Sequence, residues 1–138
     1  MTRLTIPRGL LASGINSYSE EGHAQKQAFH ADGKKFLAAL AKALGYVPGD
    51  YDLRSNIAGM AVSGEVTLHS DHLYVQLSES CMHPGVQVLY RACSGRKDYT
   101  GKTNHFAKMA DLRSTEAQAL VLRTMRGLIE QAAVNAAA

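Results

Sequence analysis

The densest group of side chains able to do chemistry lies between residues 91 and 105. The segment runs Arg-Ala-Cys-Ser-Gly-Arg-Lys-Asp-Tyr-Thr-Gly-Lys-Thr-Asn-His. Cations here would contact phosphate, the aromatic ring would stack on a base, and the closing Asn-His would form hydrogen bonds. We therefore expect a binding loop for a phosphate-bearing partner. The side chains expected to contact the ligand are Arg91, Arg96, Lys97, Tyr99, Lys102, Asn104 and His105.

The Gly-Lys-Thr sequence at residues 101–103 invites comparison with a nucleotide-binding P-loop. That motif requires a glycine five positions before the second one, and Arg96 stands there, while Gly95 is one residue too early. A P-loop also follows a strand of a parallel sheet, which the pattern of this chain does not predict. We exclude NTPase chemistry. The alternative that Arg91 or Arg96 pairs with the acidic residues Glu65 or Glu79 in a solvated loop stays open.

Histidines and cysteines near the predicted turns raise the question of a metal site. His72 and Cys81 lie nine residues apart on one predicted strand, which separates them by roughly 30 Å at the rise of an extended chain. His23 and His30 lie two helical turns apart, and no pair has the close spacing of zinc ligands. We predict no metal site and no cofactor, and we place the histidines on the surface or in hairpins.

Cys93 is the one candidate nucleophile in the segment. Arg91 and Arg96 would depress the pKa of its thiol, and His105 follows twelve residues later. A buried strand cysteine is the more common arrangement, and the carboxylates of the chain are scattered over turns and strands. We therefore predict no catalytic residue.

Composition describes an ordinary globular domain. The chain has 138 residues, 46% of them hydrophobic and 20% charged, with a formal charge of +3. Residues 46–85 carry a charge of −4, so an acidic middle is flanked by basic ends. The cysteines Cys81 and Cys93 lie far apart along a predicted hairpin, which disfavours a disulfide and favours a reducing, cytoplasmic setting. We see no secretory signal and no membrane span, and we predict no membrane partner.

Hydrophobic periodicity predicts the elements that hold the loop. Ser19 begins a helix that runs to about Leu44, with Gly45 at its end and a break conceivable at Asp32-Gly33. Residues 46–56 are expected to be a connecting loop. Alternating apolar residues then predict strands within 57–69, 73–77 and 86–90, and Phe106, Met109 and Leu112 indicate a short helical turn. A last helix starts after Asp111 or Ser114.

The predicted fold class is α+β: a three- to four-stranded antiparallel meander with an N-terminal and a C-terminal helix packed on one face. The whole chain, residues 1–138, forms a single domain. Residues 1–18 are expected to be a mobile arm or an edge strand, and residues 133–138 a frayed tail.

Two short runs carry a resemblance. They are Asp52-Leu53-Arg54-Ser55-Asn56 and Gly95-Arg96-Lys97-Asp98-Tyr99-Thr100-Gly101, the second followed by Asn104-His105. They resemble runs in small uncharacterised accessory proteins of bacterial phages and mobile elements, over roughly residues 45–112. The resemblance implies a bacterial cytoplasm and an accessory role, which includes countering host defence. It carries over no catalytic residue.

The leading functional prediction is a non-enzymatic protein that binds nucleic acid or a nucleotide-like signal through residues 91–105. One alternative is a protein-interaction module that inhibits a host defence complex. Another is a small hydrolase or transferase. The face of the sheet away from the helices, where Tyr74 and Gln76 point, is either exposed or pairs with another subunit of a homo-oligomer.

Overall fold

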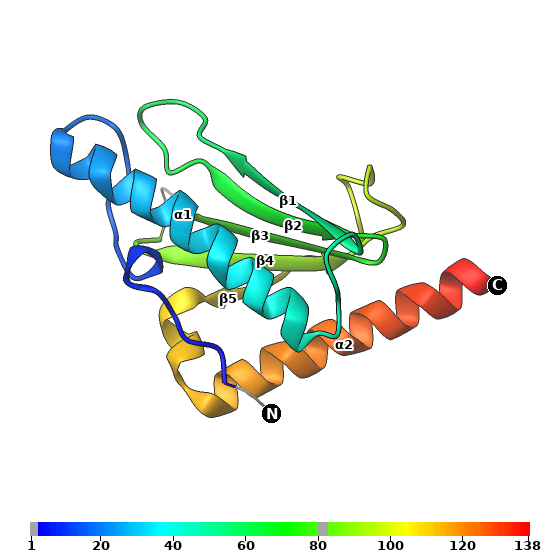
Figure 1. Cartoon of the computed structure of the whole chain (residues 1–138). Coiled ribbons are helices and arrows are strands. Elements are labelled where there is room, and N and C mark those ends of the chain that lie inside the picture. The colour runs from blue at the N-terminus through cyan, green and yellow to red at the C-terminus, as the bar shows by residue number, and fades with distance from the viewer. Residues whose placement is uncertain (1–2, 80–82) are drawn as a thin grey trace.

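A computed structural model describes residues 3–79 and 83–138 of the chain. Two long helices, α1 (Glu20–Ala43) and α2 (Thr115–Ala137), lie against a sheet in a two-layer α+β arrangement (Figure 1). The predicted fold class is confirmed. The loop between β3 and β4 includes Cys81, so the prediction about its pairing falls outside the described residues.

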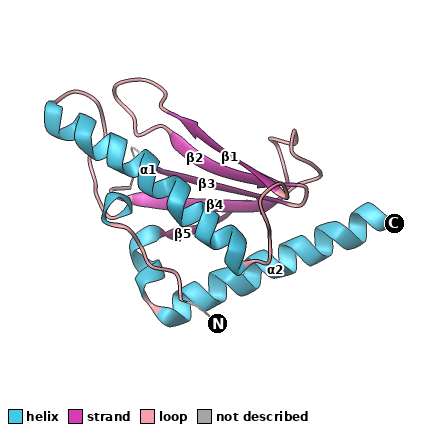
Figure 2. Ribbon diagram, viewed as in Figure 1, coloured by secondary structure: helices cyan, strands magenta, loops and turns pink. Residues whose placement is uncertain are grey.

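The sheet has five antiparallel strands in the order β1-β2-β3-β4-β5, so each strand pairs with its neighbours in sequence (Figure 2). The three central strands correspond to the alternating apolar runs of the sequence. Two further strands at the edges bring the count above the three or four expected. The bounds are β1 Tyr51–Asn56, β2 Glu65–Ser70, β3 Leu73–Glu79, β4 Val86–Ala92 and β5 His105–Lys108.

The two faces of the sheet differ in polarity because side chains alternate along each strand. The face under the helices is a continuous apolar layer, to which α1 contributes Phe29, Phe36 and Leu37. Helix α1 contacts β1 and β2, whereas α2 contacts β3 and β4. Both helices therefore share one face, as expected. The layer of sheet residues is Val66, Leu68, Leu73, Val75, Leu77, Val86, Val88 and Tyr90.

Helix α1 begins and ends at the residues that its sequence marks. The Ser19 side chain accepts a hydrogen bond from the Gly22 amide, and Gly45 adopts φ +89° just beyond the last turn. The helix is continuous through Asp32-Gly33, where a break was conceivable. Ser114, not Asp111, caps α2 by accepting from the Ala117 amide. None of the helices in the described ranges is long and apolar enough to cross a membrane.

The N-terminal segment differs from the expected mobile arm or edge strand. Residues 3–18 form no strand but a 3-10 turn, η1 (Arg8–Leu10), and they bury Leu4, Leu10 and Ile15 in the core. Apolar burial and not strand pairing therefore holds this segment. At the other end, α2 is helical to Ala137, where we expected a frayed tail.

Candidate functional site

The loop between β4 and β5, residues 93–104, is organised around the carboxylate of Asp98. This carboxylate accepts hydrogen bonds from the backbone amides of Ser94 at 2.9 Å, Gly101 at 3.0 Å and Thr100 at 3.2 Å. The Thr100 hydroxyl donates a fourth at 3.0 Å. These donors hold the pKa of Asp98 far below its ordinary value. Three amides of the loop are therefore committed to an internal anion and cannot donate to a bound phosphate.

Arg96 is committed to the scaffold. Its guanidinium lies 3.5 Å from the Asp52 carboxylate and 3.3 Å from that of Asp71, and it donates to the Gly49 carbonyl at 2.6 Å. Arg96 therefore forms ion pairs, as the alternative interpretation of the loop expected. Its partners are Asp52 and Asp71, however, and not Glu65 or Glu79. Arg96 ties the loop to the β2–β3 turn and to the edge strand β1.

Arg91 is also held by its surroundings. Its guanidinium lies 4.4 Å from the centre of the Tyr74 ring, donates to the Tyr99 carbonyl, and donates to the Asn104 side chain at 3.3 Å. Its Nε is buried and has no hydrogen-bond acceptor among the described residues. Asn104 is consequently oriented by Arg91, and both close the base of the loop.

Tyr99 caps a buried histidine. Its ring meets the His69 ring edge-on at 5.4 Å, and the Arg54 guanidinium lies 5.7 Å from its centre. The loop thereby folds over one half of the sheet face that is turned away from the helices, and His69 is fully buried beneath it. Even so, Tyr99 keeps 57% of its surface exposed and could still receive a planar ligand.

Of three further predicted contact residues, two are exposed and one is half-buried. Lys97 and Lys102 are exposed, and neither lies within ion-pair distance of a carboxylate among the described residues. His105 stands on β5 and stacks on Tyr90 at 5.3 Å. The seven predicted residues thus separate into a structural group (Arg91, Arg96, Asn104), a half-exposed ring and these three side chains.

A groove of about 740 Å³ lies between this loop and the C-terminal half of α2. We call it the loop–helix groove. Lys102 and His105 line it together with His72, and no Asp or Glu contributes to its lining. Leu128 and Ala132 of α2 supply an apolar wall. The remaining lining residues are Ala92, Cys93, Ser94, Thr103, Gln131, Asn135 and Ala136.

Sequence reasoning missed the contribution of α2 and of His72 to this groove. Gln131 and Asn135 interrupt an alanine-rich stretch at a spacing of one helical turn, and Gln131 donates to Asn135 at 3.1 Å. That spacing was a signal for a polar patch on the helix. The sequence around Gln131 and Asn135 did not, however, indicate that this patch would face the loop. Its position depends on the angle at which α2 crosses the sheet.

Cys93 is a buried cysteine, the arrangement preferred from the sequence over an activated thiol. Cys93 is 2% exposed and its Sγ donates to the Ser70 carbonyl at 3.3 Å. Burial raises the pKa of the thiol, whereas the nearby arginines were expected to lower it. The pKa rises because the loss of solvation on burial has a larger effect than the nearby cations. One of these cations, Arg96, is already paired with carboxylates.

His30 is buried in α1, contrary to the prediction that the histidines lie on the surface or in hairpins, whereas the buried His69 belongs to the β2–β3 hairpin. His30 of α1 has Nδ1 2.6 Å from the Ser55 hydroxyl and Nε2 2.8 Å from the Ser63 carbonyl. The carbonyl fixes the proton on Nε2, so the Ser55 hydroxyl donates to Nδ1. This pair resembles a serine–histidine dyad in distance alone. It lies beneath the β1–β2 loop and contributes to none of the larger grooves, so it ties α1 to the sheet.

Metal-binding geometry is absent from residues 3–79 and 83–138, where no three His, Cys, Asp or Glu side chains lie close enough to hold an ion. No family model, curated protein or solved structure significantly matches the chain.

Proposed function

We propose that this chain is a non-enzymatic binding protein that holds a phosphate-bearing ligand of nucleotide size in the loop–helix groove. One observation carries the proposal: Lys102, His72 and His105 converge on a groove that has no acidic side chain in its lining. A free ammonium and two imidazoles can donate to phosphate oxygens, and the hydroxyls of Ser94 and Thr103 add further donors.

A nucleotide suits the groove better than a polymer does. Its volume of about 740 Å³ falls within the range of small-molecule pockets. The apolar wall of Leu128 and Ala132 gives a planar base a surface to lie on while the phosphate reaches Lys102. The ligand would contact fewer loop residues than the sequence suggested, because Arg91 and Arg96 hold the loop together and are not free to bind phosphate.

Binding is favoured over catalysis by the state of the candidate nucleophile. The Cys93 thiol is buried at the groove floor, and its raised pKa leaves little thiolate at neutral pH. The groove thus combines hydrogen-bond donors, Lys102 and the two histidines, with an unreactive thiol. This combination favours binding an anion over reacting with it. An accessory role in a phage or mobile element, which the resemblance implies, is compatible with a sensor or sequestering protein of this kind.

The two exposed lysines of the loop provide a matched test. Lys102 lines the groove and Lys97 does not, although both are exposed and both belong to the same loop. Titration calorimetry with a panel of mononucleotides, cyclic nucleotides and a dT oligonucleotide would measure Kd for the wild type, Lys102→Ala and Lys97→Ala. We expect Lys102→Ala to weaken binding of one nucleotide at least about tenfold, as loss of a charged hydrogen bond does, and Lys97→Ala to have little effect.

Equal weakening by the two substitutions would contradict the groove and indicate diffuse attraction by the loop. Preference for the oligonucleotide with a steep dependence on salt would favour nucleic acid instead. No binding of any phosphate compound by the folded wild type would overturn the proposal.

A further inference from the structure

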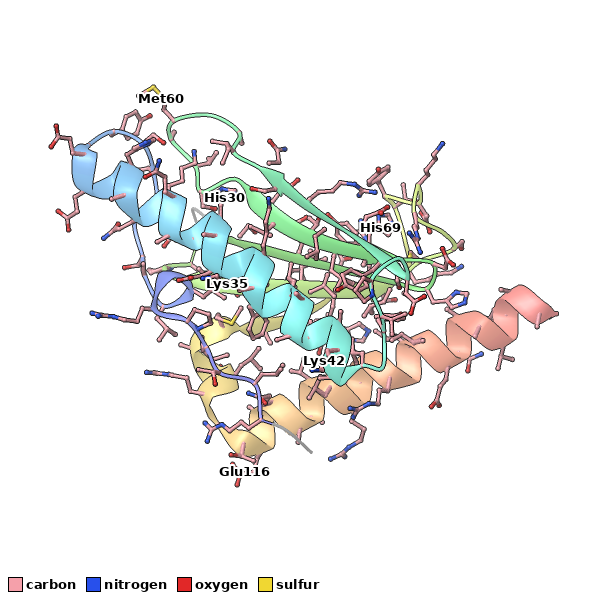
Figure 3. All side chains as sticks on the ribbon, viewed as in Figure 1. His30, Lys35, Lys42, Met60, His69 and Glu116 are labelled. Carbon is pink, nitrogen blue, oxygen red and sulfur yellow. The ribbon has the colours of Figure 1, made fainter. Side chains whose placement is uncertain are left out.

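A cluster of exposed apolar side chains lies at the end of the molecule opposite the loop–helix groove. Ile57, Met60 and Val62 of the β1–β2 loop are 52%, 60% and 47% exposed, and Tyr18, just before α1, is 69% exposed. We call these four residues the apolar knob. Figure 3 shows Met60 at the tip of the loop, pointing away from the body of the molecule. Such clusters on a folded protein mark surfaces that contact a partner.

The loop that displays the knob is held in place at a cost. Ala58 adopts φ +57°, a conformation that alanine rarely takes. Lys26 is only 3% exposed, and its ammonium group donates a hydrogen bond to the Gly59 carbonyl at 2.9 Å. The Ser17 amide also donates to the Met60 carbonyl at 2.8 Å. A strained residue and a buried cation thus fix a backbone whose apolar side chains face solvent, which is preorganisation for binding.

The rim of the knob is acidic. Glu20 and Glu21 are exposed in the first turn of α1, next to Tyr18. No Lys or Arg occurs within residues 9–25, which lead into α1, or within residues 55–64, which include the β1–β2 loop. A polyanion or an anionic surface would be repelled. The partner must offer an apolar recess surrounded by cations.

The same chain carries such a recess. A groove of about 530 Å³ runs between the N-terminal segment and the C-terminal half of α1. Leu4, Pro7 and Phe36 give it an apolar floor, Arg3, Lys35 and Lys42 line its sides, and no carboxylate contributes to it. We call it the cationic groove. It has the complementary charge and the same apolar character as the knob.

The knob and the cationic groove cannot meet within one molecule. They belong to opposite ends of α1, and the 22 steps from Glu20 to Lys42 correspond to roughly 33 Å of helix. Figure 3 shows Met60 and Lys42 well separated, at the two ends of this helix. Any contact between the two surfaces is therefore made between two copies of the chain.

We propose that this protein self-associates head to tail, with the apolar knob of one copy seated in the cationic groove of the next. Glu20 and Glu21 face Lys35 and Lys42 across that contact. The interface is heterologous, so each added copy leaves one knob and one groove free. Assembly continues into a ring or an open filament and does not stop at a dimer.

Single substitutions at exposed positions test each surface with a matched control. Met60→Asp disables the knob, and Val134→Asp introduces the same charge at a side chain that is 63% exposed on α2. Lys35→Glu disables the groove, and Lys34→Glu makes the same change one residue away, outside the groove lining. All four sites are exposed, so the fold should persist, which circular dichroism verifies.

Sedimentation velocity over a range of protein concentrations measures the outcome. The wild type and both controls are expected to grow beyond dimers as concentration rises, whereas Met60→Asp and Lys35→Glu each remain monomeric. A mixture of these two variants is decisive. Each retains the surface that the other lacks, so the mixture should form a one-to-one dimer and nothing larger.

Three results would overturn the proposal. They are a wild type that remains monomeric at about 0.5 mM, where even contacts of millimolar affinity are detectable, a wild type that stops at a symmetric dimer, and a mixture in which the two variants fail to pair. Nucleotide binding through the loop–helix groove does not depend on this outcome, because Met60 and Lys35 lie outside that groove.

Discussion

His30 and His69 are two histidines whose burial is not indicated by the sequence around them. Burial lowers the pKa of both, and neighbouring cations, Lys26 for His30 and Arg54 for His69, add to the effect. For His69 the Gly95 backbone opposes the shift. Both rings are therefore neutral in the fold at neutral pH. In the unfolded chain the same histidines titrate near 6.5.

This difference predicts a loss of stability in mild acid. Below about pH 6.5 the unfolded chain binds protons that the folded chain does not, so the free energy of unfolding falls as pH decreases through that range. The slope is at most about 1.4 kcal/mol per pH unit for each histidine. Urea denaturation at a series of pH values between 7.5 and 5 measures it. His69→Gln should flatten the slope, and His23→Gln, at an exposed histidine, should leave it unchanged. An unaltered slope in His69→Gln would contradict the assignment.

Cys93 yields a prediction about reactivity. Because its thiol is buried and its pKa is raised, alkylation by iodoacetamide at pH 7.5 should be at least about tenfold slower than that of a cysteine in a short peptide. Mass spectrometry of the peptide containing residue 93, taken over time from the folded protein, reports the rate. Rapid alkylation at pH 6 would instead indicate an activated nucleophile and revive the hydrolase alternative.

At the scale of elements, Gly33 explains how α1 approaches the sheet. A Cβ at this position would lie 2.9 Å from Cγ2 of Val66, which is closer than real Cβ contacts. The glycine that weakens the helix in isolation therefore permits its close packing on β2. Gly127 of α2 has no neighbour within 4 Å of the same position and serves no such purpose.

The two glycines should consequently respond to alanine with opposite signs. Gly127→Ala is expected to raise the free energy of unfolding by about 0.5–1 kcal/mol through helix propensity. Gly33→Ala should lower it by about 1–3 kcal/mol through overpacking. Chemical denaturation measures both. Combining Gly33→Ala with Val66→Ala should recover part of that loss, and a stabilising Gly33→Ala would show that the helix can shift away from the sheet.

The edge strands show where local pattern fails. β1 contains Asp52 and Arg54 at alternate positions and lacks an apolar run, so its segment was expected to be a loop. β5 has only four residues and includes Phe106, which was expected to form a short helical turn with Met109 and Leu112. Both strands form because a neighbouring strand offers unpaired backbone groups, a long-range effect that periodicity does not contain.

At the scale of the whole molecule, Gln118 joins segments that are far apart in the sequence. Its side chain accepts from the Leu4 amide at 2.7 Å and donates to the carbonyls of Leu4 and Leu112 at 3.0 and 2.9 Å. It is 5% exposed, so these three backbone groups depend on it for hydrogen bonds. The N-terminal segment is thereby held to α2.

Loss of this clamp should destabilise the entire fold. Gln118→Ala is expected to lower the free energy of unfolding by about 2–4 kcal/mol, because it leaves buried donors and acceptors without partners. Gln131→Ala removes the same side chain from an exposed part of α2 and should change stability by less than about 0.5 kcal/mol. Thermal and urea denaturation compare the two. Equal, small effects would mean that the N-terminal segment contributes little to folding.

The candidate site was only partly predictable. Residue types placed a cationic segment at 91–105, and two of its cations, Lys97 and Lys102, are exposed. Which cations are free could not be predicted, because Arg96 meets Asp52 and Asp71 only after β1 and the β2–β3 turn have come together. The α2 wall of the loop–helix groove likewise exists only once that helix crosses the sheet.

Local propensity and periodicity were sufficient to predict the fold class, the helix start at Ser19 and the alternation of the central strands, because these features depend on interactions over a few residues. For the last helix they left Asp111 and Ser114 as alternative starts. They could not predict that the basic loop stabilises itself through Asp98 and Arg96, or that Lys102 and His105 join α2 in a groove. The reason is physical: the partner of a charge is set by distance in space, and the chain brings such partners together from segments far apart in sequence.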